Sequence, residues 1–224
     1  MAFELIKYWA VLIILLFSSL SNWVSGEPQV PCYFVFGDSL VDHGNNNALL
    51  TLAKANYPPN GIDFPRGSTG RFSNGQTSAD ITAELLGFDE YIPAFATANG
   101  EEILKGVNYA SAAAGIRRES GQELGRFGPV TLDRANLLAR PDHLEIEWPT
   151  GARFCLDDQL RHHETIISSI TNLLGNKDTT TKYLSKCLYS MALGSNDYLN
   201  NYFLPILYPT SLQYTSEQYA DVLI

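Results

Sequence analysis

Three short apolar runs, each followed by glycine, serine or asparagine, mark the predicted strands of this chain. They cover residues 32–36, 106–110 and 186–193. The first run is continuously apolar rather than alternating, which is typical of a parallel strand that is covered on both faces. We therefore predict a parallel sheet in which all three strands are buried.

Two longer segments repeat apolar residues at the spacing of a helix. The first covers residues 77–86, and Gly87 is its predicted stop. The second covers residues 156–174 and ends at Gly175-Asn176. Its predicted apolar face consists of Leu160, Ile166, Ile167, Ile170, Leu173 and Leu174.

The order of these elements predicts the fold class. Strands separated by helices and loops indicate a three-layer α/β/α sandwich around a parallel sheet, and the length of 224 residues favours one domain. Residues 56–74 contain three prolines and three glycines and are predicted to form a long surface loop, while residues 216–224 begin a further helix. Ligands of such sheets bind beyond the carboxyl ends of the strands, so we expect the site there.

The strand ends carry the candidate chemistry. Gly37-Asp38-Ser39 places a hydroxyl on a tight turn directly after the first strand, which is the layout that a serine nucleophile needs. Asn196 follows the third strand and could donate its side-chain amide to an oxyanion. Gly115 follows the second strand and could donate its backbone N–H. Gly-Asp-Ser alone is ordinary turn chemistry, so the combination carries the prediction.

The three cysteines, Cys32, Cys155 and Cys187, permit at most one disulfide and match no zinc-binding spacing. Because Cys32 and Cys187 begin apolar strands, we favour their role as small buried residues of the core.

Composition and charge exclude several classes of protein. The chain is 45% hydrophobic and 17% charged, which excludes a disordered chain. Its formal net charge is −9, and no cluster of lysine or arginine is present. This balance argues against a nucleic acid or an anionic membrane surface as a partner, because both are bound by neutralising phosphate.

Residues 1–26 are predicted to be a signal peptide. Lys7 precedes the apolar residues 9–17, and Val24-Ser25-Gly26 supplies small or short residues before a cut after Gly26. The apolar run is too short to span a bilayer stably. A buried N-terminal helix is the less favoured alternative because the run is uniformly apolar. The mature chain, residues 27–224, is therefore expected to be secreted and extracellular.

Several blocks of the sequence resemble, in order, those of the plant-type GDSL esterase/lipases, a branch of the SGNH hydrolases. The blocks are residues 34–42 (FVFGDSLVD), 44–47 (GNNN), 70–75 (GRFSNG), 106–111 (GVNYAS) with Gly115, and 189–202 (YSMALGSNDYLNNY). The resemblance implies an SGNH-type α/β/α hydrolase that cleaves carboxylic esters through an acyl-serine, without metal or cofactor. It implies that Ser39 is the nucleophile and that Gly115, Asn196 and the N–H of Ser39 form the oxyanion hole. Lipids, acylated polysaccharides and small acyl esters are all possible substrates.

The chain departs from this family in its general base. The family carries an Asp-x-x-His near its C-terminus, and no such motif follows Asn196. The four histidines are His43, His143, His162 and His163. His43 lies too close to Ser39 in the chain to reach its Oγ freely. His162 and His163 are expected on the solvated side of their helix, so the base and its aspartate are expected to be absent from this chain.

Two further departures concern chain length. Residues 126–151 have no counterpart in the family, and we interpret them as a retained intron or gene-model error, with a genuine loop insertion as the alternative. The resemblance also implies over a hundred further residues with two more strands, so the third strand would be an exposed edge and this partial domain would fold poorly.

Two other functions remain open at this level. One is a catalytically inactive truncated form, at most a remnant that binds acyl groups or a partner. The other is an acyltransferase on the same scaffold.

Overall fold

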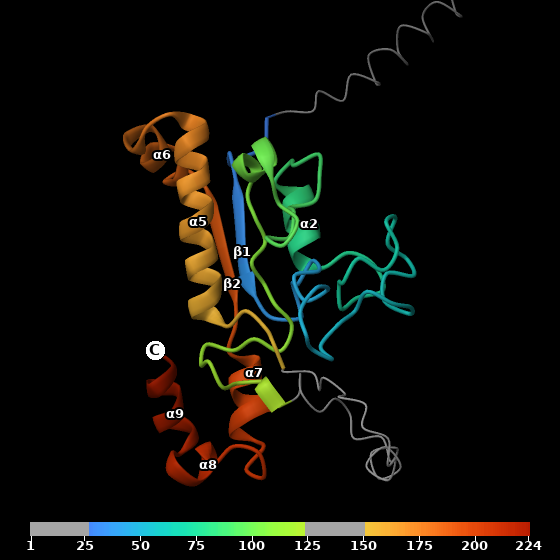
Figure 1. Ribbon diagram of the computed structural model, residues 1–224, viewed down its shortest axis with the longest axis vertical. Coiled ribbons are helices and arrows are strands. Elements are labelled where there is room, and N and C mark those ends of the chain that lie inside the picture. The colour runs from blue at the N-terminus through green and yellow to red at the C-terminus, as the bar shows by residue number, and fades with distance from the viewer. Residues whose placement is uncertain (1–26, 124–150) are drawn as a thin grey trace, which may run out of the picture.

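Two parallel strands lie at the centre of the molecule (Figure 1). In this computed structural model, which describes residues 27–123 and 151–224, they are β1 (Tyr33–Gly37) and β2 (Leu188–Ala192). They pair in register from Tyr33 opposite Leu188 to Gly37 opposite Ala192. The first and third predicted strands are thus confirmed. The predicted signal peptide lies outside the described residues, as does all of the predicted insertion except Gly151.

The second predicted strand, residues 106–110, was wrong as a regular strand. This segment runs parallel to β1 and meets it only at an isolated bridge between Val35 and Asn108. The Val35 N–H donates to the Val107 oxygen at 3.1 Å, and the Tyr109 N–H donates to the Val35 oxygen at 2.7 Å. The next ladder bond is missing because the Gly37 N–H donates to Oε1 of Gln159 instead, at 3.0 Å.

Helices cover both faces of the sheet, which confirms the three-layer arrangement (Figure 1). Successive side chains of β1 point to opposite faces, so each face has its own core. The core on the side of α5 contains Cys32, Phe34, Phe36, Ile103, Val107, Tyr109, Ile166 and Ile170. The core on the side of α2 contains Tyr33, Val35, Val41, Ala79, Ala83, Phe88, Ile92 and Ala110.

Both predicted long helices are confirmed as α2 (Ser78–Leu85) and α5 (Leu156–Leu174). Thr77 and Asp80 form a capping box at the start of α2. The buried face of α2 is its alanine stripe, because Ile81 and Leu85 are 47% and 74% exposed. On α5 the buried side chains are Gln159, Ile166 and Ile170, whereas Leu160 and Leu173 of the predicted face are exposed.

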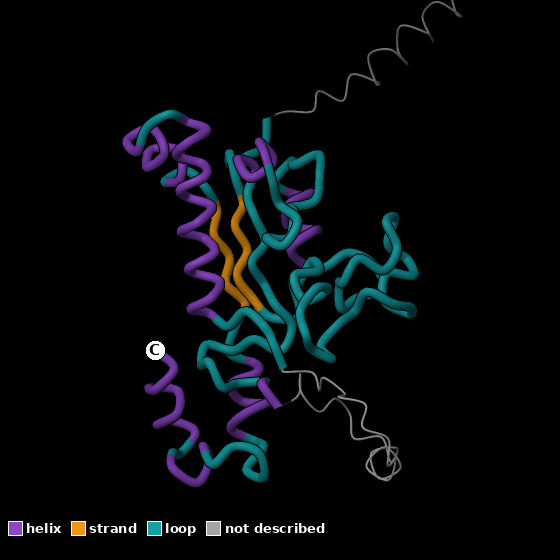
Figure 2. Tube along the Cα trace, in the orientation of Figure 1, coloured by secondary structure: helices purple, strands orange, loops and turns teal. Residues whose placement is uncertain are grey.

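The remaining elements are short. They are the 3₁₀ helix η1 (Gly100–Lys105), α6 (Lys177–Leu184), α7 (Ser195–Asp197), the π-helical turn η2 (Tyr198–Tyr202), α8 (Thr210–Gln213) and α9 (Ser216–Leu223). The helix predicted from residue 216 is therefore confirmed, and α6 was not predicted. Residues 38–77 contain neither helix nor strand, as expected for the long loop within them (Figure 2).

The prediction for two cysteines was wrong. Cys32 and Cys187 form a disulfide that joins the residues just before β1 and β2, with their Cα atoms 4.7 Å apart. The parallel register places the two strand starts side by side, so the pair is close although 155 residues separate it in sequence. Cys155 is a buried free thiol.

The predicted burial of the third strand was also wrong. Tyr189 and Met191 of β2 are exposed. Within the described residues β2 pairs with β1 alone, so its other edge has no strand beside it. This matches the expectation that β2 would be an exposed edge.

Candidate functional site

The candidate nucleophile lies on the turn that follows β1. Ser39 is partly exposed, Leu40 is exposed, and Asp38 between Ser39 and the strand is buried. Gly37 is required for this turn, because a Cβ there would lie 2.3 Å from Cγ2 of Val41. Oδ1 of Asp38 accepts the Leu40 N–H at 3.0 Å, which closes the turn. The Ser39 hydroxyl is thus presented beyond the carboxyl end of β1.

Asp38 also binds the turn that follows β2. Its Oδ2 accepts the Ser195 hydroxyl at 2.5 Å and lies 3.4 Å from Nδ2 of Asn196. Asn196 is buried and donates the same Nδ2 to the Ala114 oxygen at 2.7 Å. Its Oδ1 accepts from Nδ2 of Asn200. These bonds bring the ends of β1 and β2 and the loop before Gly115 to one edge of the sheet.

The loop of residues 111–117 is held at both ends by buried carboxylates. Asp42 accepts the Ala112 N–H at 3.0 Å. Asp197 accepts the N–H groups of Ile116 and Arg117 at 2.8 and 3.0 Å. Asp197 further accepts the Ser120 hydroxyl at 2.6 Å. The backbone course of this loop is therefore set by side chains from two other strand ends.

Gly115 is the position where this arrangement admits no side chain. A Cβ on Gly115 would lie 2.7 and 2.8 Å from the two carboxylate oxygens of Asp197 and 2.5 Å from Cβ of Ser120. The absence of a side chain therefore lets the Asp197 carboxylate approach the loop.

Several backbone donors at this edge are left free by the network. Among the described residues, the N–H groups of Ser39, Ala113 and Gly115 donate to no acceptor. Ala113 has a φ of +64°, in the left-handed region that favours glycine. Donors held in place in this way can stabilise a negative charge that forms near them.

Below the site, asparagines of the block at residues 44–47 are buried supports. Nδ2 of Asn45 donates to the oxygens of Asn108 and Ala110 at 2.9 and 2.7 Å. Oδ1 of Asn46 accepts the Ser111 hydroxyl at 2.5 Å. Burial raises the pKa of Asp42 to about 6, although its three backbone N–H donors oppose this shift.

The described histidines contact groups other than Ser39. The two ring nitrogens of His43 lie 2.9 Å from the Ile92 oxygen and from Oγ1 of Thr77. Burial and the nearby Arg71 lower the pKa of His43 to about 4. This agrees with the expectation that His43 does not serve Ser39. His143 lies outside the described residues.

The prediction that His162 and His163 are solvated was wrong. His163 lies at the edge of the Phe34 ring, with centroids 4.9 Å apart, and its Nδ1 lies 3.0 Å from the Tyr109 hydroxyl. Burial lowers the pKa of His163 to about 4. His162 stacks on Phe95 with centroids 3.9 Å apart. Aromatic side chains lie under α5, and the rings of both histidines pack against them.

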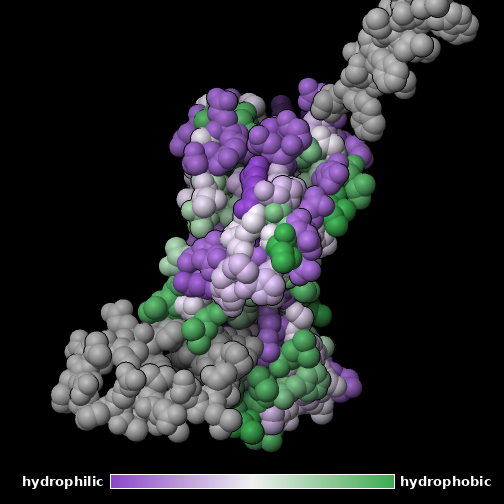
Figure 3. All heavy atoms as spheres, turned by 90° about the vertical axis from the view of Figure 1, so that its right-hand side faces the viewer, coloured by the Kyte–Doolittle hydropathy of each residue, from purple (hydrophilic) through white to green (hydrophobic). Residues whose placement is uncertain are grey.

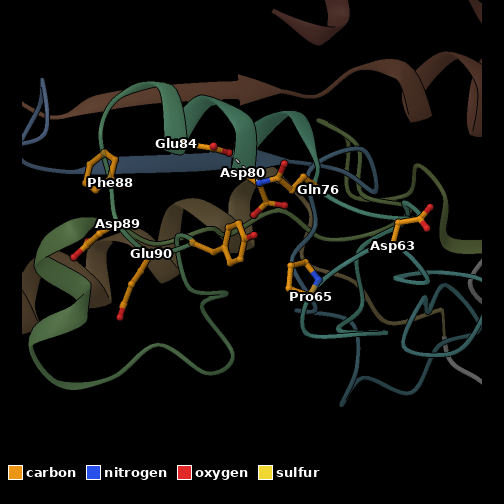
Figure 4. Close-up of a pocket in the computed structure, with 9 residues that line it drawn as sticks. Asp63, Pro65, Gln76, Asp80, Glu84, Phe88, Asp89 and Glu90 are labelled. Carbon is orange, nitrogen blue, oxygen red and sulfur yellow. Dashed lines mark hydrogen bonds between the residues drawn. The ribbon is translucent and has the colours of Figure 1, made fainter. Parts of the chain in front are cut away.

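The largest cavity described lies away from this edge (Figure 4). It measures about 510 Å³ and is bounded by α2, the loop before it and the segment that follows it. Its lining includes Asp63, Asp80, Glu84, Asp89 and Glu90. Three of these carboxylates already have partners. Arg71 binds Asp80 through two nitrogens, Gln76 binds Glu84, and Lys105 binds Asp89. Across residues 27–123 and 151–224, no group of three or more His, Cys, Asp or Glu side chains is arranged to hold a metal ion.

The helices of residues 27–123 and 151–224 include none with the length and apolar character needed to cross a membrane.

The fold and the site together define a class: an α/β/α protein with a serine-bearing turn and free backbone donors at the carboxyl edge of a parallel sheet. Serine-dependent hydrolases use this layout. A family model described as GDSL-like lipase/acylhydrolase matches residues 33–224. The chain belongs to this family.

Curated relatives from Arabidopsis thaliana cover nearly all of the chain. The chain is 50% identical over 220 residues to GDSL esterase/lipase At1g29660, and the match covers 98% of the chain and 52% of that relative. The chain is 51% identical over 203 residues to GDSL esterase/lipase At4g18970, and the match covers 91% of the chain and 49% of that relative. GDSL esterase/lipase At1g29670 is 49% identical over 220 residues, covering 98% and 53%. The chain thus spans about half the length of these relatives. No solved structure gives a significant match.

The structure brings Ser39, Asn196 and the loop that carries Gly115 to one edge, and it adds residues that sequence reasoning missed. Asp38 and Asp197 join the strand ends, and neither had been given a role. Asp38 directly precedes Ser39 in sequence, and Asp197 directly follows Asn196. A carboxylate at the end of a predicted buried strand needs hydrogen-bond donors, and this was the signal that could have identified both residues.

Proposed function

We propose that this protein is a secreted hydrolase of carboxylic esters and that Ser39 is its nucleophile. The observation that carries the proposal is that the turn with Ser39 and two other strand ends lie at one edge of the sheet. Asn196 joins them through its contacts with Asp38 and with the Ala114 oxygen. Family membership supports the reaction class, and the names of the relatives support ester substrates. Lipids and other acyl esters are the proposed substrates, without metal or cofactor.

In this mechanism Oγ of Ser39 attacks the carbonyl carbon of the ester, and its proton passes to a general base. The carbonyl oxygen becomes an oxyanion, which the N–H groups of Ser39 and Gly115 stabilise. The alcohol leaves with a proton, and water then hydrolyses the acyl-serine and regenerates the hydroxyl. We place the base, with its aspartate, in the half of the relatives' length that this chain does not match.

Asn196 is proposed as the third oxyanion donor. Its Nδ2 makes one short bond to Ala114 and one long contact, 3.4 Å, to Asp38. The long contact is the one that an oxyanion can replace, because it is the weaker of the two. Asp38 keeps the Ser195 hydroxyl as a partner when Asn196 turns to the substrate.

We also propose that residues 1–26 are removed on secretion and that residues 27–224 belong to one hydrolase domain. The disulfide between Cys32 and Cys187 supports this compartment, because disulfides persist in oxidising environments and are rare in the cytosol.

A fluorophosphonate probe tests the proposal, because it reacts with an activated serine and marks the residue covalently. The full chain, extended by the C-terminal length that its relatives have because the proposed base lies there, is incubated with the probe, and peptide mapping by mass spectrometry locates the adduct. We expect an adduct on Ser39, none in Ser39→Ala, and an unchanged site of labelling in Ser195→Ala. Absence of labelling in the folded chain, or labelling that survives Ser39→Ala, would favour the inactive form.

A further inference from the structure

Gln159 forms an unusual contact with the strand that leads to Ser39. It lies on α5 and is completely buried. Its Oε1 accepts the Gly37 N–H at 3.0 Å, and its Nε2 donates to the Gly37 oxygen at 2.9 Å. Nε2 also donates to the Phe154 oxygen at 2.7 Å. The side-chain amide therefore acts toward Gly37 as the backbone of a neighbouring strand would.

This contact replaces one hydrogen bond of the strand pairing. The bonds between Val35 and residues 107 and 109 set up a regular parallel ladder, whose next step would join the Gly37 N–H to the Tyr109 oxygen. Gln159 occupies that N–H. The other bond of this step is kept, since the Ser111 N–H donates to the Gly37 oxygen at 3.1 Å, and beyond Gly37 the chain forms the nucleophile turn.

The start of α5 also contacts the loop of residues 111–117. The Phe154 N–H donates to the Ser111 hydroxyl at 2.9 Å, and the Leu156 N–H donates to the Gly115 oxygen at 3.2 Å. One helix end therefore holds both the nucleophile turn and the loop with the free N–H donors. Packing alone does not explain a glutamine there, because the other buried side chains of α5, Ile166 and Ile170, are apolar.

We propose that Gln159 is a positioning residue that sets the geometry of Ser39 relative to the oxyanion donors. The inference deepens the proposed function and rests on it. Gln159 touches no reacting atom and acts through the Gly37 peptide. Replacing it with an apolar side chain leaves the buried Gly37 N–H without an acceptor and the Gly37 oxygen with the Ser111 N–H alone, so the turn shifts to satisfy the N–H.

The test compares amide hydrogen exchange and probe labelling in the full chain. Gln159→Met removes the amide at similar size, and Ile166→Val is the matched control that loosens the same helix face without touching Gly37. Gln159→Glu adds a pH readout. A protonated carboxyl has one donor and one acceptor, as the amide has toward Gly37, whereas an ionised carboxylate has no donor. Each variant is compared with the wild type at the same pH.

In Gln159→Met we expect protection of the Gly37 amide to fall at least tenfold, with α2 and the C-terminal half of α5 changing no more than in Ile166→Val. Labelling of Ser39 should fall by about the same factor. Gln159→Glu should behave like Gln159→Met at pH 8 and recover toward the wild type near pH 5. Unchanged protection at Gly37, a uniform loss as in the control, or no recovery at low pH would overturn the inference.

The two readouts separate this inference from the proposed function. A wild-type chain that is not labelled, but whose Gly37 exchange follows the expected pattern, counts against the proposed function and leaves the positioning contact standing. A labelled wild type whose Gln159→Met variant is labelled at the same rate counts against Gln159 alone.

Discussion

His43 shows how a histidine beside a candidate nucleophile becomes a structural residue. Its Nδ1 faces a carbonyl oxygen, that of Ile92, so this nitrogen carries the proton, and Nε2 lies 2.9 Å from Oγ1 of Thr77. Asp80 lies 3.2 Å from Nε2, and Arg71 binds Asp80 through two nitrogens. The ring is completely enclosed, which favours its neutral form.

The first prediction concerns the pH dependence of stability. Because the folded pKa of His43, about 4, lies below the unfolded value of 6.5, the unfolded chain takes up this proton first as the pH falls. The contribution is complete above pH 6.5 and is lost between pH 6.5 and pH 4, by about 3 kcal/mol. The free energy of urea unfolding of the wild type minus that of His43→Gln should shrink by this amount. A difference that does not vary with pH would contradict the assignment.

Asp197 provides a second prediction. Asp197→Ala leaves the N–H groups of Ile116 and Arg117 and the Ser120 hydroxyl without their acceptor. Unfolding in urea should show a loss of about 2–4 kcal/mol, because buried donors that lose their partner keep their desolvation cost. Asp221→Ala, at an exposed carboxylate of α9, should change stability by less than about 0.5 kcal/mol. Equal losses in the two variants would refute this role.

Gly115 provides a third prediction. In Gly115→Ala the new Cβ lies within 2.8 Å of both Asp197 oxygens, so the loop or the carboxylate must move. We expect a loss of about 1–3 kcal/mol in a thermal or urea melt. Gly75→Ala is the control, because the nearest atom to its Cβ is 3.8 Å away. The two variants should therefore differ clearly, and similar melts would show that the loop adapts freely.

The meeting of Ser39, Asn196 and the Gly115 loop at one edge followed from the sequence, because parallel strands end on the same side of a sheet. The carboxylates that join these ends did not. Asp38 and Asp197 bind groups 157 and 80 residues away, such as the hydroxyl of Ser195 and the N–H of Arg117. Such pairings depend on the register of the sheet, which no local pattern reveals.

At the level of elements, local signals predicted the helices well. The capping residue Thr77 and the left-handed Gly175, with a φ of +85°, mark where α2 begins and where α5 ends. The segment of residues 106–110 failed as a strand for a tertiary reason, since Gln159 from α5 takes its next ladder bond. Asn176 was interpreted only as the end of α5, yet it also caps α6 by accepting the Thr179 N–H.

The disulfide provides a prediction for the sheet. It closes a loop of 155 residues, so breaking it should destabilise the fold by about 3–5 kcal/mol through the unfolded state. Cys187→Ala should lower the melting temperature and abolish the effect of a reductant on the melt. Cys155→Ala, at the free thiol, should keep the reductant effect. A wild-type melt that is the same with and without reductant would contradict the prediction.

At the scale of the whole molecule, apolar side chains gather at the lower end of the face shown in Figure 3, where η2 and the segment that follows it lie. Ile206 is 96% and Leu212 79% exposed, and residues 198–214 contain no charged side chain. Apolar surface of this kind favours association in water despite the net charge of −9. We expect sedimentation velocity to show concentration-dependent oligomers at micromolar concentration. Ile206→Lys should reduce these without changing the melt, and a monomeric wild type would contradict the prediction.

The contacts that join the strand ends also bear on the order of folding during synthesis. Asp38 accepts a hydrogen bond from Ser195, and the loop after Gly115 donates one to Asp197. Neither contact can form until the chain around residue 197 has left the ribosome. Loops of this length close slowly, and a chain of high contact order exposes its apolar strand in the meantime. The nucleophile turn is therefore among the first segments made and among the last to reach its final geometry.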